Sequence, residues 1–180
     1  MRKEFNPQRL DVQAFADDGA QLQGSAFLAD MPRLLAEVAG RGPDLAVRWR
    51  AQGELLDPHH VRPQVWLHLR ADTVLPLTCQ RCLLPVDTPV SFERAFRFVA
   101  DESTAEAEDE LAEEDVLALS RAFDLPALVG DELLLEVPLV PRHEACPEPV
   151  KLSVADPDFE AEPERPNPFA VLGRLKGGKS

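Results

Sequence analysis

The sequence predicts an α+β fold in which a twisted antiparallel sheet, either open or closed toward a barrel, packs against two helices. Three observations support this: long stretches in which apolar and polar residues alternate, two shorter stretches with helical periodicity, and a Pro-rich C-terminal part that leaves little room for regular structure. The 180 residues, 44% of them apolar, suit one domain with an extension. We therefore expect one α+β domain over residues 1–150, followed by a Pro-rich acidic linker and an irregular C-terminal tail over residues 151–180.

The first predicted helix covers residues 31–39, and a strand follows it. Asp30 can cap the helix, Pro32 lies in its first turn where a missing N–H costs nothing, and the apolar residues fall on one helical face. Residues 45–50 then alternate with a period of two, which is typical of a half-buried strand. Trp49 shares the apolar side of this strand, so we expect it in the core.

Two longer stretches, residues 61–79 and 86–98, keep the same alternation on either side of a pair of cysteines. They predict two antiparallel strands joined at those cysteines. Trp66 falls on the polar side, where it either contacts a partner or is buried beneath a further layer. The polar sides of these strands and of residues 45–50 carry many of the chain's arginines.

Acidic residues are concentrated in the second half of the chain. Residues 101–115 contain nine acids and no base, so this segment should repel itself and form a mobile, solvated loop. A second helix is expected over residues 124–137, capped by Asp124 and ended by Pro138. The net charge of −13 opposes general attraction to nucleic-acid backbones, and we expect no DNA partner.

The last eight residues, 173–180, match the G-x-x-x-x-G-K-S pattern of a phosphate-binding loop. A true loop of this kind follows a buried strand and opens a helix whose first turn holds the phosphates. Prolines precede this match and Ser180 ends the sequence, so we expect neither element to form. We interpret the match as coincidence.

Four residues in two pairs have the chemistry and number of a zinc site. Cys79 and Cys82 form a C-x-x-C at the expected hairpin tip, and His143 and Cys146 form a later H-x-x-C. Three thiolates and one imidazole supply the four ligands that tetrahedral zinc requires. Two other interpretations stay open: a thiol-redox pair at the C-x-x-C, and cysteines that are simply small buried side chains.

Nothing in the sequence predicts catalysis, because the common hydrolase, metalloprotease and dinucleotide-binding motifs are absent. No apolar stretch approaches the roughly 20 residues of a membrane-spanning helix, and three cysteines are an odd number for a disulfide framework. We expect a non-enzymatic cytoplasmic protein with no membrane contact.

Three segments together resemble the family of the large ribosomal RNA subunit accumulation protein, YceD: "LTCQRCLLPV", "FDLPALVGDELLLEVPLVPRHEAC" and "NPFAVLGRLK". They occur in this order between about residues 45 and 176, and the last looks like the terminal signature of the family. The resemblance rests on the following matching residues: Cys79, Gln80, Arg81, Cys82, Leu125, Asp131, Glu132, Leu133, Pro138, Pro141, His143, Cys146, Asn167, Pro168, Phe169 and Leu172.

The resemblance implies a cytoplasmic factor that supports large-subunit biogenesis and 23S rRNA accumulation without catalytic activity. In many bacteria the family is encoded beside a small ribosomal protein of the large subunit. We therefore expect the partner to be either a ribosomal protein of the large subunit, shielded by the acidic runs at 101–115 and 156–164, or the rRNA of the assembling pre-50S particle. The expected partner-binding residues are Arg48, Arg50, Arg62, Arg70, Arg81, Arg97, Asn167, Pro168, Phe169, Leu172 and Lys176.

Overall fold

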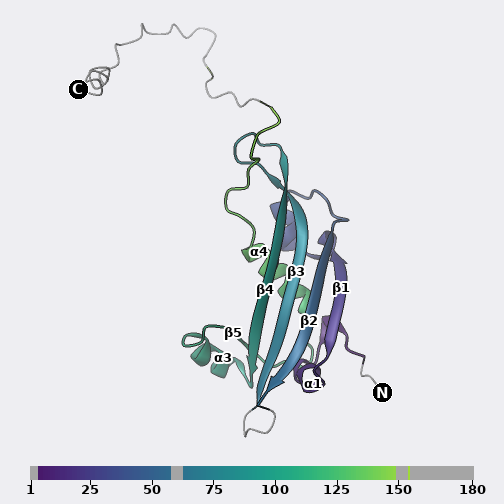
Figure 1. Cartoon of the computed structure of the whole chain (residues 1–180), viewed down its shortest axis with the longest axis vertical. Helices are drawn as coiled ribbons and strands as arrows, with labels where there is room; N and C mark the ends of the chain where they lie inside the picture. The colour runs from purple at the N-terminus through teal and green to yellow at the C-terminus, as the bar shows by residue number, and fades with distance from the viewer. Residues whose placement is uncertain (1–3, 58–62, 149–153, 155–180) are drawn as a thin grey trace, which may run out of the picture. The chain divides into compact units, whose positions relative to one another are not determined.

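The computed structural model describes residues 4–57, 63–148 and 154, and nearly all of these belong to one compact unit, Met1–Glu148. A five-stranded sheet with the order β1-β2-β3-β4-β5 forms the centre of this unit (Figure 1). The strands are β1 (Gln21–Phe27), β2 (Ala46–Leu56), β3 (Gln64–Thr78), β4 (Pro85–Val99) and β5 (Asp115–Ala118). The α-helices are α1 (Val12–Asp17), α2 (Pro32–Glu37), α3 (Glu102–Asp109) and α4 (Leu125–Leu135), with 3₁₀ turns at Pro7–Arg9 and Leu28–Asp30.

The α+β class is confirmed, but the sheet is open and does not close into a barrel. Strands β1 and β5 lie at opposite edges of the sheet. Helices α1, α2 and α4 cover one face, as Figure 1 shows, and their apolar side chains complete the core. Because this layer already buries the inner face of the sheet, closure is not needed to form a core. The sheet is also mixed, since β5 runs parallel to β4.

The two long strands predicted from alternation are confirmed as β3 and β4. They pair along nearly their whole length, from Val65 opposite Phe98 to Thr78 opposite Pro85. Trp49 on β2 is in the core, with 8% of its surface exposed, and Trp66 lies on the outer face and is partly buried. The inner face of β3 is a continuous row of buried side chains: Val65, Leu67, Leu69, Ala71, Thr73, Leu75 and Leu77.

The described residues contain four α-helices instead of the two that were predicted. The predicted helices correspond to α2 and α4, and Asp124 caps α4 by accepting a hydrogen bond from the Ala127 N–H at 3.0 Å. Helix α1 was not predicted. It packs so closely on β2 that a Cβ at Gly53 would lie 2.6 Å from the carbonyl oxygen of Phe15, which is why glycine occupies this position.

The acidic segment 101–115, predicted as a loop, instead contains helix α3 and the first residue of β5. The Asp101 side chain caps α3 by accepting from the Thr104 N–H at 2.9 Å. Arg97 on β4 forms ion pairs at 2.6 Å with Glu108 and with Glu114, which offset part of the repulsion within the segment. The mobility of this segment remains a prediction.

The predicted linker and tail, 151–180, lie outside the described residues except for Val154, and so does the 173–180 motif. Within the described part of the chain, none of the helices has the length and apolar character that crossing a membrane would require.

Candidate metal centre

The turn between β3 and β4 positions Cys79 and Cys82. Two backbone hydrogen bonds close it: the Cys79 N–H donates to the Leu84 carbonyl at 2.9 Å, and the Leu83 N–H donates to the Cys79 carbonyl at 2.8 Å. Leu83 has a φ of +62°, the left-handed conformation that glycine normally supplies in such turns. A leucine in this conformation indicates that the surrounding structure imposes the turn despite its cost.

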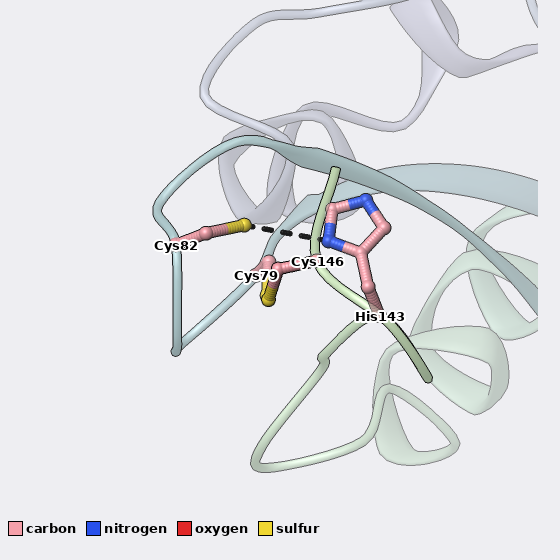
Figure 2. Close-up of side chains that lie close together, drawn as sticks. All are labelled: Cys79, Cys82, His143 and Cys146. Atoms are coloured by element: carbon pink, nitrogen blue, oxygen red, sulfur yellow. Dashed lines mark hydrogen bonds between the residues drawn. The ribbon is translucent and has the colours of Figure 1, made fainter. Parts of the chain in front are cut away.

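The second pair of candidate ligands reaches the turn from the segment that follows helix α4. The backbone N–H of Gln80, in the turn, donates to the carbonyl of Pro141 at 2.8 Å. This bond holds the two segments together just before His143 and Cys146. Figure 2 shows the four side chains converging from the hairpin turn on one side and the later segment on the other.

The geometry of the cluster suits one tetrahedral metal ion. The three sulfur atoms and one imidazole nitrogen all lie within 4.8 Å of one another, and Cys82 Sγ is 3.4 Å from His143 Nδ1. Around zinc, Zn–S bonds of about 2.3 Å and Zn–N bonds of about 2.0 Å place ligand atoms roughly 3.5–3.8 Å apart. The three cysteines form no disulfide. This group can therefore hold a metal ion with only small movements of its side chains.

The electrostatic environment differs among the thiols. Burial opposes ionisation of Cys79, but hydrogen bonds from backbone N–H groups, including those of Cys82 and His143, outweigh it and lower the pKa of Cys79 to about 5. Burial, followed by the neighbouring Cys82, raises the pKa of Cys146. The turn therefore stabilises at least one thiolate, which is the form that binds metal.

The same arrangement does not favour thioredoxin-like chemistry. A reactive C-x-x-C of that kind lies at the N-terminus of a helix, whose dipole stabilises the attacking thiolate. Here Cys82 is followed by the rest of the turn and then by strand β4. Four convergent ligands are instead typical of a closed structural site, which leaves no coordination position for a substrate.

The arginines predicted to bind a partner have different environments. Arg48 is ion-paired with Asp72, Arg97 with Glu108 and Glu114, and Arg50 donates to the Gln23 side chain at 3.0 Å. Arg70 and Arg81 are exposed and, among the described residues, have no ion pair. Arg62 and the five tail residues, Asn167, Pro168, Phe169, Leu172 and Lys176, lie outside the described residues.

Sequence reasoning missed an ion pair on the inner face of the sheet. Arg94 on β4 points toward α4, where its Nη1 lies 2.8 Å from Glu132 Oε2 and its Nη2 lies 2.8 Å from Glu136 Oε1. Glu132 Oε2 is buried and accepts no hydrogen bond from the described residues, so Arg94 contacts it as an ion pair. Burial raises the pKa of Glu132, and Arg94 opposes that shift. The sequence contained a signal for this inward position, because Arg94 lies two residues from each of the buried Phe92 and Phe96 and so falls on the same side of the strand.

The protein has an α+β fold with an open sheet. The Cys₃His cluster at the hairpin tip forms a candidate metal centre of the structural type. The chain belongs to the family described as Large ribosomal RNA subunit accumulation protein YceD, whose family model matches residues 67–176. The match includes both halves of the cluster.

A curated relative from Haemophilus influenzae, described by the same words, is 36% identical over 104 residues. The alignment covers 56% of this chain and 59% of the relative, so the chain spans somewhat more than half of the relative's length. No solved structure matches the chain.

Proposed function

We propose that this protein supports the accumulation of large-subunit rRNA in the cytoplasm by binding a component of the assembling particle, without catalysing a reaction. Membership of the family supports the link to large-subunit rRNA. The closed arrangement of the Cys₃His cluster supports a structural and not a catalytic role for its thiols.

The charge of the described body favours a basic protein as the direct partner. Its residues include 27 acids, 11 arginines and no lysine. Several of the arginines are already engaged with carboxylates, as Arg33 is with Asp131 and Arg97 is with Glu108. A surface with this excess of negative charge repels phosphate backbones and attracts Lys- and Arg-rich proteins. A basic ribosomal protein of the large subunit fits this surface better than rRNA does.

The test is binding of the full chain to two defined probes: total protein extracted from purified large ribosomal subunits, and protein-free large-subunit rRNA. We expect one or a few basic ribosomal proteins to bind, with an affinity that falls steeply between about 0.05 and 0.5 M salt because the contacts are ionic. Binding to rRNA alone would favour rRNA as the direct partner, contacted through the exposed arginines. Failure of both probes to bind at low salt would refute the proposal.

A second proposal concerns the cluster itself. The spacing of three thiols and one imidazole supports Zn²⁺ held by Cys79, Cys82, His143 and Cys146. The metal would join the β3–β4 turn to the segment after α4. Metal analysis of the full chain, purified without a histidine tag, should give one zinc per chain. A content near zero, in protein whose thiols remained reduced throughout purification, would contradict this proposal.

A further inference from the structure

Three exposed apolar residues at the end of helix α4 and directly after it are together called the ridge. The ridge consists of Leu135 in the last turn of the helix, with 68% of its surface exposed, and of Leu139 and Val140, with 98% and 59% exposed. Single exposed apolar residues are common, but three within six residues of sequence are unusual and indicate a contact surface.

The backbone presents the ridge in a restricted conformation. Leu139 and Val140 stand between Pro138 and Pro141, whose rings fix their own φ angles and restrict the residues that precede them. The Pro141 carbonyl accepts the hydrogen bond from Gln80. The segment is thus tied to helix α4 at one end and to the cysteine turn at the other. A binding segment that is already ordered loses little conformational entropy when a partner binds.

Two surface hollows flank the ridge. One, of about 720 Å³, lies between the beginning of β4 and residues 138–145, and Val140 lines it. The other, of about 380 Å³, lies beside the end of β3, and Leu139 lines it. Strand β5 pairs with β4 only over Phe96–Val99, so the beginning of β4 has no strand on that side within the described residues. An incoming segment can therefore place apolar side chains on both sides of the ridge.

The charges around these hollows are mainly negative. Asp87 and Glu144 line the larger hollow and Glu37 lines the smaller one. All three carboxylates are exposed, and no ion pair to them occurs among the described residues. Arg142 is the only arginine among the residues that line the two hollows. The ridge is therefore apolar with an acidic rim.

We infer that the ridge formed by Leu135, Leu139 and Val140 is the docking site for a basic protein segment that carries apolar side chains. This inference rests on the proposed function and locates its binding surface. Charge complementarity selects the occupant: a basic segment places its cations against the carboxylates while its apolar side chains enter the hollows. A second copy of this chain would bring two acidic rims together, and rRNA would bring phosphates against them.

The experiment compares the full-length wild-type chain with Leu139→Ser and Val140→Ser. Leu111→Ser is the matched control, because Leu111 is also a highly exposed leucine, with 89% of its surface exposed, but follows helix α3. The probes are again total protein from large ribosomal subunits and protein-free large-subunit rRNA. Circular dichroism melts confirm that each variant remains folded, which is expected because both ridge residues are largely solvated.

We expect Leu139→Ser to weaken binding of the ribosomal protein by roughly tenfold or more, as truncation of an interface anchor typically does, and Val140→Ser to weaken it less. Leu111→Ser should bind as the wild type does. If the wild type binds and both ridge variants bind equally well, the ridge is not the docking site, while the proposed function stands. If the wild type binds only rRNA or no probe at all, both the ridge assignment and the choice of a basic protein partner fail.

Discussion

The two ends of the paired strands β3 and β4 are held by different interactions. At the cysteine end, three thiols and one imidazole from two segments converge within 4.8 Å as candidate ligands, and a backbone hydrogen bond from Gln80 supports them. At the acidic end, Arg97 pairs with Glu108 and Glu114. Metal coordination is strong and responds to chelators, whereas partly exposed ion pairs are weak and respond to pH and salt. We therefore expect one end of the sheet to depend on metal and the other to depend on charge.

The largest effect is expected from Cys79→Ser, which removes the fully buried ligand of the cluster. We expect a loss of stability of about 4 kcal/mol, because losing a metal ligand is among the few single changes with effects of this size. Chelation of the wild type should produce a similar loss. Thermal unfolding with and without chelator measures both. After chelation, hydrogen exchange should accelerate more at the β3–β4 turn than at β5.

Gln80→Ala provides the control for this prediction, since Gln80 lies between the two cysteines but its exposed side chain is not a ligand. It should retain both the metal and the stability. Suppose that Cys79→Ser unfolds at the wild-type temperature and that chelator lowers the unfolding temperature of neither protein. The cluster then does not stabilise this end.

A smaller effect is expected at the acidic end from Arg97→Ala. The Arg97 side chain is only 14% exposed and contacts two carboxylates, so its removal should cost about 1–2 kcal/mol, between the values typical of surface and buried pairs. The matched control is Arg48→Ala, whose pair with Asp72 is largely exposed and should contribute much less to stability. Urea unfolding of both variants measures the two losses of stability. Equal losses would contradict the expectation that the Arg97 pairs contribute more than the Arg48 pair.

Acid should loosen the same end. Hydrogen bonds from Ser103 and Thr104 lower the pKa of Asp101, and Arg97 lowers that of Glu114. Carboxyls with depressed folded-state pKa values contribute stability that is fully present above their unfolded values, near 4, and is lost as the pH falls through the folded values. Amide exchange followed by NMR from pH 6 to pH 3 should show α3 and β5 losing protection before the centre of β3. Simultaneous loss throughout the sheet would argue against a separate charge-dependent end.

The smallest effect is expected from Leu83→Gly in the cysteine turn. Glycine adopts the observed φ of +62° without steric cost, whereas leucine does not. The greater freedom of glycine in the unfolded chain offsets part of this gain, so we expect a net stabilisation of about 0.5 kcal/mol. Leu83 is exposed, so little packing is lost. A clearly lower melting temperature would indicate that its side chain makes contacts that matter.

The sequence allowed prediction of those parts of the fold whose stabilising pattern is local. Alternation identified β3 and β4, and Asp124 marked the start of α4. Strand β1 was missed because its inward positions include Gly24, whose lack of a side chain makes room for Trp49; a Cβ there would lie 2.7 Å from the indole. Helix α3 was missed because the composition of the acidic segment does not show that Arg97, on the strand before it, pairs with Glu108 and Glu114.

The candidate metal centre was predictable in its members but not in its geometry. Ligand types and spacing pointed to Cys79, Cys82, His143 and Cys146. Their convergence depends on the contact between Gln80 and Pro141, which no periodicity reveals. Likewise, alternation placed Arg48 and Arg97 on the outer face but could not show that both are paired with carboxylates. Pairings between distant segments leave no signal in local sequence.

The most direct test of metal binding at the cysteine end is X-ray absorption at the zinc edge on the full chain, purified without a histidine tag. We expect one zinc per chain, bound by three sulfurs at about 2.3 Å and one nitrogen at about 2.0 Å. Native protein without stoichiometric zinc, in which Cys79, Cys82 and Cys146 all react freely with a thiol reagent, would contradict it.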